Sequence, residues 1–175
     1  MLERLWNGWR STYVASIEPV TESGEGSIFT QILNSGLSDE VSNIVHRGVT
    51  CFAILNAYPY ATGHLLILPH REVADLELLT DEETAELWST VKAAVVAVKS
   101  TYRPEGVNVG LNLGRPAGGS VSEHLHVHIV PRWTGDSNFM TAIANTRTLP
   151  EPLQDTAARI RKAWPVSDGG TDSPH

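Results

Sequence analysis

The segment that organises this chain reads His124-Leu125-His126-Val127-His128-Ile129-Val130. Histidine alternates with apolar residues along its whole length. Side chains alternate between the two faces of a β-strand, so the three imidazoles are expected on one face and the apolar side chains on the other. We therefore predict a strand from His124 to Val130 with one face for chemistry and one face for the core.

Three interpretations of the histidine face compete. A buried structural role would give up apolar contacts and leave several polar atoms in need of partners. A metal site is a second interpretation, because neutral imidazole is a common zinc ligand, although no obvious thiol or carboxylate set completes it. In the third, one imidazole is the nucleophile of a covalent mechanism and its neighbours position that nucleophile and its target. The residues upstream favour the third interpretation.

A glycine-rich loop precedes the histidines and reads GLNLGRPAGGSVSE from Gly110 to Glu123. Glycines let backbone N–H groups approach an anion closely, and Asn112, Ser120 and Ser122 add short neutral donors. The loop therefore predicts contact with phosphate. The alternative is a plain hairpin turn between strands 107–112 and 124–130, which explains the glycines but not the asparagine and serines among them.

These motifs resemble the signature of the histidine triad superfamily of nucleotide hydrolases and transferases. A second block, FAILNAYPYATGHLLILP from Phe52 to Pro69, is similar to the first hairpin of that superfamily. At finer scale, Ser27–Leu33, Cys51–His64 and Glu123–Trp133 resemble the actinobacterial diadenosine tetraphosphate phosphorylases. The resemblance implies an α+β fold, in which an antiparallel sheet of hairpins carries one long helix and a shorter C-terminal helix.

The resemblance also implies roles for individual residues. His126 is expected to be the nucleophile, because the middle histidine of the triad attacks the α-phosphorus of the substrate in this family. A reference pKa of about 6.5 leaves most of an imidazole neutral, and therefore nucleophilic, at pH 7. His124 and His128 flank the nucleophile and are expected to orient it and to contact phosphate oxygens, and His64 is a further active-site histidine. The positions expected to face the phosphates are Asn112, Gly119 and Ser120. The expected nucleotide contacts are Asn56, at the ribose, and Phe52.

Two departures from broader family patterns refine these expectations. Some branches hold a structural zinc through a Cys-x-x-Cys pair, but the matching segment here is Ser27-Ile28-Phe29-Thr30 and the one cysteine is Cys51, so no metal site is expected. Many hydrolases of the superfamily carry glutamine at the position of Ser120. The shorter side chain is predicted to leave room for inorganic phosphate beside the intermediate, and Ser120→Gln should shift the products from ADP toward AMP.

Composition excludes several classes of protein. The chain has 175 residues, of which 41% are hydrophobic, so it is long enough for one domain with a real core. Its longest apolar run, 93–98, is far too short to cross a membrane. A formal charge of −7, without a dense basic cluster, argues against nonspecific binding of nucleic acid. One cysteine and no signal peptide predict a cytoplasmic protein.

The expected organisation is an N-terminal extension (1–25), a catalytic domain (26–165) and a disordered tail (166–175). Within the domain, helices are predicted over 27–34, from the capping box at Thr80 to Tyr102, and over 153–164. Strands are predicted over 51–56, 64–68, 107–112 and 124–130, with a strand or loop over 44–49.

The reaction expected from these observations is the phosphorolysis of diadenosine tetraphosphate to ATP and ADP through a nucleotidyl-histidine. Inorganic phosphate is the co-substrate, and no further cofactor is required. A hydrolase of dinucleoside polyphosphates or nucleoside phosphoramidates is the nearest alternative, because water would open the same intermediate. A non-catalytic nucleotide sensor is the alternative from another class. The resemblance implies a homodimer.

Overall fold

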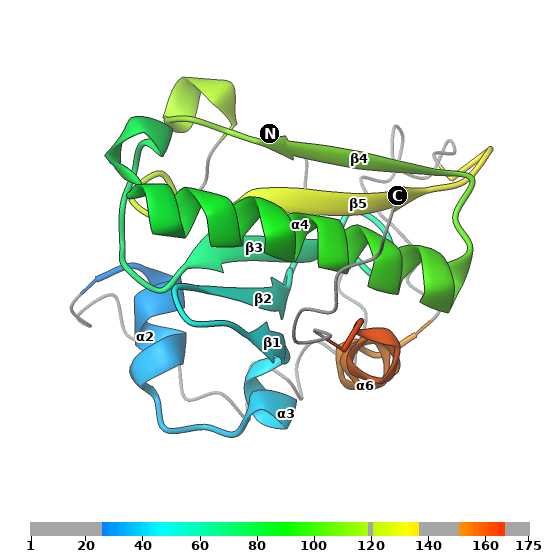
Figure 1. Ribbon diagram of the computed structural model, residues 1–175. Helices are drawn as coiled ribbons and strands as arrows, with labels where there is room; N and C mark the ends of the chain where they lie inside the picture. The colour runs from blue at the N-terminus through cyan, green and yellow to red at the C-terminus, as the bar shows by residue number, and fades with distance from the viewer. Residues whose placement is uncertain (1–25, 119–120, 137–150, 167–175) are drawn as a thin grey trace, which may run out of the picture.

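The computed structural model describes residues 26–118, 121–136 and 151–166. A five-stranded sheet forms the centre of the molecule, with strand order β1-β2-β3-β5-β4 (Figure 1). The strands are β1 (Ile44–Arg47), β2 (Cys51–Leu55), β3 (Leu65–Pro69), β4 (Gly106–Leu111) and β5 (Val127–Arg132). All neighbouring strands are antiparallel, as predicted for a sheet built from hairpins.

One long helix, α4 (Asp81–Tyr102), crosses one face of the sheet (Figure 1). It begins at the predicted capping box, where Glu83 N–H donates to the Thr80 hydroxyl and Thr80 N–H donates to the Glu83 carboxylate. The C-terminal helix α6 (Leu153–Ala163) packs against α4 and β1. These two helices and the sheet confirm the predicted α+β fold. None of the described helices is both long and apolar enough to span a bilayer.

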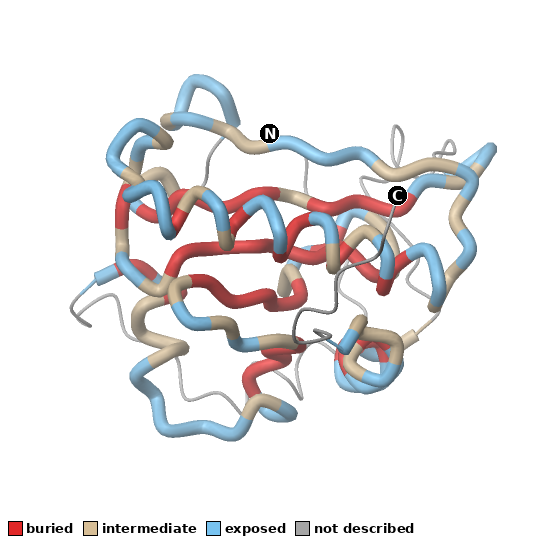
Figure 2. The backbone as a smooth tube through the Cα atoms, in the orientation of Figure 1, coloured by how far each residue is buried: buried red, intermediate tan, exposed pale blue. Residues whose placement is uncertain are grey.

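Two apolar clusters cover the two faces of the sheet. Ala53, Leu55, Leu65 and Ile67 point toward α4 and α6, into the larger cluster. The alternate residues of the same strands point the other way and meet Phe29 of α2 (Ile28–Asn34). As a result β2, β3 and most of β5 are buried, whereas β4 is an exposed edge strand (Figure 2). A helix of four residues, α3 (Asp39–Ser42), and the turns η1 (Leu76–Leu78) and η2 (Arg115–Ala117) were not predicted.

The histidine segment differs from the prediction in one respect. The strand β5 begins at Val127, so His124 and His126 precede it rather than lie within it. The partner strand β3 pairs with β5 only as far as Ile67 opposite Val127 and ends at Pro69, which has no N–H to donate to a ladder. The segment ahead of β5 is instead anchored by Leu125 N–H, which donates to the carbonyl of Val73 at 2.6 Å.

Of the predicted domain boundaries, the N-terminal extension lies outside the described residues, as does all of the tail except Val166. The boundaries themselves stay predictions.

Candidate active site

His126 has the hydrogen-bonding pattern of a nucleophile. Its Nδ1 lies 2.8 Å from the backbone carbonyl oxygen of His124, which can only accept a hydrogen bond. The ring proton is therefore assigned to Nδ1, and the lone pair of Nε2 remains available. The ring is buried and packs against Phe29 of α2 with a centroid separation of 5.5 Å. Burial and two fixed contacts hold this nitrogen in one direction.

His124 lies at the buried end of the triad. Its Nε2 is 2.9 Å from the carbonyl oxygen of Pro69, so Nε2–H donates there, and its Nδ1 accepts from the hydroxyl of Ser27 at 2.7 Å. Both ring nitrogens are used and the side chain is 0% exposed. His124 therefore orients His126 through its backbone carbonyl. The expectation that its ring contacts phosphate oxygens is wrong, because no ring nitrogen is left for a ligand.

A polar network behind His124 connects it to the start of α2. Ser27 is the N-cap of this helix. Its side-chain oxygen accepts a hydrogen bond from Thr30 N–H at 3.2 Å, and its hydroxyl donates to Nδ1 of His124. The carboxylate of Glu72 accepts from Ser27 N–H at 2.7 Å and from the Thr30 hydroxyl at 2.5 Å. These hydrogen bonds lower the pKa of Glu72. The network fixes the helix end against the segment that carries His126.

At the other end of the triad, a chain of hydrogen bonds sets the proton on His128. The backbone N–H of Tyr60 donates to Nδ1 of His64 at 3.0 Å, so the proton of His64 lies on Nε2. That Nε2–H donates to Nδ1 of His128 at 2.9 Å. The proton of His128 must then lie on Nε2, which is buried and has no hydrogen-bond partner among the described residues. His128 thus offers one N–H donor to a ligand.

The protonation state of His128 suits a neutral donor. Burial, followed by the nearby His126, lowers the pKa of His128 to about 4. The ring therefore stays uncharged at pH 7 and donates a hydrogen bond without giving up a proton.

The ring of Tyr60 stacks on His128 with an interplanar angle of 12° and also lies against His64. The loop that carries Tyr60 turns at Gly63, where φ is +83° and a Cβ would meet the Tyr102 ring at 3.0 Å.

The predicted nucleotide contacts have different outcomes. Asn56 lies beside the histidines, with its Nδ2 3.4 Å from Nδ1 of His64, and its Oδ1 accepts from Tyr58 N–H at 2.9 Å. Phe52 is 0% exposed within β2 and stacks on His70, with ring centroids 5.4 Å apart. A side chain buried within the apolar cluster cannot contact a nucleotide, so the prediction for Phe52 is wrong. The motif resemblance located the right hairpin but did not separate core positions from accessible ones.

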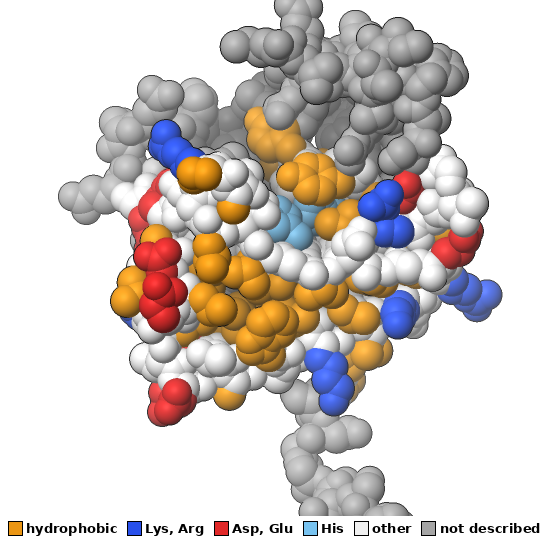
Figure 3. Space-filling view, turned by 90° about the horizontal axis from the view of Figure 1, so that it is seen from above, with side chains coloured by type: hydrophobic (Ala, Val, Ile, Leu, Met, Phe, Trp, Pro, Cys, Tyr) orange, Lys and Arg blue, Asp and Glu red, His pale blue; other side chains and the backbone are white. Residues whose placement is uncertain are grey.

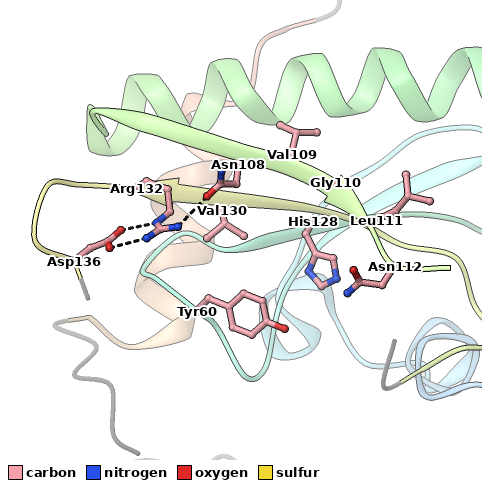
Figure 4. A pocket seen from close by; sticks show the side chains of 10 residues that line it. All are labelled: Tyr60, Asn108, Val109, Gly110, Leu111, Asn112, His128, Val130, Arg132 and Asp136. Carbon is pink, nitrogen blue, oxygen red and sulfur yellow. Dashed lines mark hydrogen bonds and ion pairs between the residues drawn. The ribbon is translucent and has the colours of Figure 1, made fainter. Parts of the chain in front are cut away.

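A cavity of about 400 Å³ opens beside His128 and continues along β4 and β5 (Figure 4). Asn112, one of the predicted phosphate-facing residues, lines it together with His128 and Tyr60. The other two predicted loop positions, Gly119 and Ser120, lie outside the described residues. The histidines lie in a hollow on the side of β4 away from α4 (Figure 3).

The described residues include no group of three or more His, Cys, Asp or Glu side chains arranged to hold a metal ion. Ser27 and Thr30, which take the place of the Cys-x-x-Cys pair, are hydrogen bonded to His124 and Glu72 instead. Cys51 is a buried free thiol, and burial raises its pKa to about 11.

Comparison with known proteins identifies the family. The HIT domain model matches residues 39–135, which include β1 to β5, His64 and the complete triad. The chain belongs to the HIT family. Over 167 residues it is 46% identical to the AP-4-A phosphorylase of Mycobacterium tuberculosis H37Rv. The aligned region covers 93% of this chain and 85% of the relative. It is also 33% identical over 95 residues to the asymmetrical bis(5'-nucleosyl)-tetraphosphatase of Schizosaccharomyces pombe, over 54% of this chain and 52% of that protein.

Solved HIT structures have the same fold. A Hit-like protein from Bartonella henselae superposes with a TM-score of 0.67 at 26% identity, covering 81% of this chain and 98% of that one. A histidine triad nucleotide-binding protein from Sulfolobus tokodaii superposes with a TM-score of 0.63 at 29% identity, covering 77% and 89%.

Three residues of this HIT site were not assigned roles from the sequence: Ser27, Tyr60 and Glu72. Ser27 could have been found as a helix N-cap, since it is the first residue of the predicted helix 27–34 and directly precedes two apolar residues. Tyr60 lies within the quoted hairpin motif, but its hydrogen bond to His64 comes from the backbone N–H, which no residue type signals. Glu72 carries no local signal, because its partners lie 42 and 45 residues earlier in the chain.

Proposed function

We propose that this chain is a diadenosine tetraphosphate phosphorylase that forms a nucleotidyl-histidine on His126. One observation carries the proposal: the hydrogen bonds of the triad leave a lone pair on His126 Nε2 and an unshared N–H on His128, on adjacent rings with centroids 4.9 Å apart. A nucleophile next to a neutral donor suits attack on phosphorus, where charge develops on the oxygens around the centre. The choice of substrate is supported by the 46% identical relative.

In the first step, His126 Nε2 attacks the α-phosphorus of diadenosine tetraphosphate. A nitrogen–phosphorus bond forms, the bond from phosphorus to the bridging oxygen breaks, and ATP leaves with the electron pair of that bond. The Nδ1 proton stays in place, so the adenylylated ring is cationic and the carbonyl of His124, 2.8 Å away, stabilises it. The N–H of His128 is positioned to stabilise negative charge on the phosphate or leaving oxygen.

In the second step, an oxygen of inorganic phosphate attacks the same phosphorus. The nitrogen–phosphorus bond breaks, His126 recovers its lone pair, and ADP is released. Asn112 lines the cavity beside His128 and can donate its amide to phosphate oxygens. Gly119 and Ser120 are proposed to contact phosphate as well, and the short side chain of Ser120 to admit phosphate in place of water.

The test is to incubate the protein with diadenosine tetraphosphate, with and without phosphate, and to separate the nucleotides by chromatography. ADP and ATP in equal amounts, formed only with phosphate, are expected. His126→Ala should lower the rate by more than about a thousandfold, because it removes the nucleophile. AMP and ATP formed without phosphate would instead identify a hydrolase, and tight binding without turnover a sensor.

The hydrolase is the second candidate because the tetraphosphatase relative is 33% identical to this chain over 95 residues. The described geometry supports the nucleotidyl-histidine for either acceptor, so the phosphate experiment discriminates between them.

We also propose a homodimer. Among the described residues β4 is an edge strand of the sheet, and an apolar surface covers β4 and the neighbouring α4 (Figure 3). Its exposed members include Trp88, Val96 and Val109. Light scattering should give twice the chain mass, and Val109→Lys should shift it toward one chain. A cytoplasmic location stays a prediction from cysteine content.

A further inference from the structure

The cavity beside His128 extends well beyond the triad. Cross-strand pairs place Gly110 opposite His128, Asn108 opposite Val130 and Gly106 opposite Arg132. Side chains of these positions share one face of the sheet, the face opposite α4. His128 and Arg132 are four positions apart on β5, which corresponds to ~13 Å along a strand. The cavity is therefore long enough to reach past the reacting phosphorus toward the leaving group.

Three polar side chains close the far end of the cavity (Figure 4). Arg132 donates to both carboxylate oxygens of Asp136, from Nε at 2.6 Å and from a terminal nitrogen at 2.8 Å. Its other terminal nitrogen donates to Oδ1 of Asn108 at 3.0 Å. This bond fixes the Asn108 amide with its oxygen toward Arg132, so its NH₂ group points away from Arg132. The ion pair has no net charge.

The chemistry of the far end favours a nucleoside over a phosphate group. A phosphate would need uncompensated positive charge, and Arg132 is already paired in a bidentate arrangement with Asp136. An amide with fixed donors recognises a heterocyclic base well, and a planar guanidinium can stack on one. The sides of the cavity suit this ligand too, because Val130 is apolar and Gly110 leaves open space, with no atom within 4 Å of an added Cβ.

We propose that this cavity binds the nucleoside of the leaving nucleotide, with Asn108 as a contact that selects dinucleotide substrates. The inference rests on the proposed function. The polyphosphate chain would run from the α-phosphorus at His126, past the donor on His128, and the second nucleoside would lie between Val130 and the Asn108–Arg132–Asp136 cluster. The cavity volume of about 400 Å³ lies in the ~300–1,000 Å³ range of small-molecule sites.

The test compares two substrates that differ only in the far nucleoside, diadenosine tetraphosphate and adenosine 5′-tetraphosphate. Asn108→Leu preserves size but removes the amide, and the same exchange at Asn34, on the exposed end of α2, is the matched control. We expect Asn108→Leu to lower kcat/KM for the dinucleotide about three- to tenfold, the value of one or two hydrogen bonds. It should leave kcat/KM for adenosine 5′-tetraphosphate and the KM of phosphate within about twofold of their wild-type values. Asn34→Leu should change none of these three constants.

Equal losses for both substrates would overturn the proposal, as would a higher KM of phosphate with the dinucleotide unaffected. Adenosine 5′-tetraphosphate could also bind in the reversed orientation, with its adenosine in the far part of the cavity, where it does not react. Such nonproductive binding leaves kcat/KM unchanged, so it does not obscure the result. If neither substrate reacts, the proposed function fails, and the cavity is then tested by calorimetric titration of His126→Ala with diadenosine tetraphosphate. In that case, an affinity that Asn108→Leu leaves unchanged would reject the nucleoside site.

Discussion

His124 and His128 stand four positions apart in one segment and face the same side of it, yet their environments are opposite. Both nitrogens of His124 have partners within the protein, and its ring is 0% exposed. One nitrogen of His128 has a partner, whereas the other has none among the described residues, and the ring lines the cavity. The first ring stabilises the fold around His126, and the second lines the cavity.

The difference arises from what other elements bring to each ring. The start of α2 and the end of β3 supply Ser27 and the Pro69 carbonyl to His124. The loop before β3 supplies one hydrogen-bond partner to His128, the ring of His64, which is itself oriented by Tyr60 N–H. Identical side chains with the same spacing therefore acquire a structural and a chemical role, which can be separated by substitution.

The largest expected difference is in catalysis. His128→Leu should lower kcat by about 10²–10³-fold, the usual cost of losing one donor to a developing charge. Its free energy of unfolding should fall by less than that of His124→Leu, because one buried group, the Nε2–H of His64, loses its partner. His128→Gln should recover part of this loss, because its amide nitrogen can take the place of Nε2. Phosphorolysis rates and thermal unfolding of both variants give the test. Equal activity of the glutamine and leucine variants would show that the N–H of His128 is not used.

The second effect is on stability. His124→Leu leaves the Ser27 hydroxyl and the Pro69 carbonyl buried without their partner, so it should lower the free energy of unfolding by about 2–4 kcal/mol. Urea unfolding measures this loss. The comparison breaks down if the variant is as stable as the wild type but loses activity as His128→Leu does, since His124 would then act on the substrate.

A smaller effect is expected from the hydroxyl that holds His124. Ser27→Ala removes both the hydrogen bond to His124 and the cap of α2, and should cost about 1–2 kcal/mol of stability. Ser100→Ala, on the exposed side of α4, is the matched control and should be neutral or slightly stabilising. Equal urea midpoints for the two variants would mean that the Ser27 contact adds nothing.

The last effect concerns pH and is similar in size to that of Ser27→Ala. The pKa of His128 is lowered to about 4 in the folded protein, so between pH 6.5 and 4 the unfolded chain binds a proton that the folded chain does not. Stability from this group is therefore complete above pH 6.5 and is lost as the pH falls toward 4. Urea midpoints at pH 7 and pH 5 should differ less in His128→Gln than in the wild type. An identical difference in the two proteins would contradict the assignment.

Much of the fold follows from local patterns. The capping box at Thr80 and Glu83 gave the start of α4, and the alternation through Val127 and Ile129 gave the face of β5 that enters the core. The pairing of the first hairpin followed from its motif, because strands that are close in sequence close a small loop. The beginning of β5 was wrong by three residues, since the absence of a ladder partner near Pro69 is a property of another strand.

For the site, local patterns specify which residues are grouped and which histidine is flanked by two others. They do not specify the partners of these residues, because a period of two specifies a face but not what packs on it. Ser27 meets His124 from 97 residues away, and Phe52 lost its predicted role when both faces of β2 became covered. Tertiary structure alone decided which nitrogen of each imidazole carries the proton, since that choice depends on a carbonyl, a hydroxyl or an N–H brought by a distant segment.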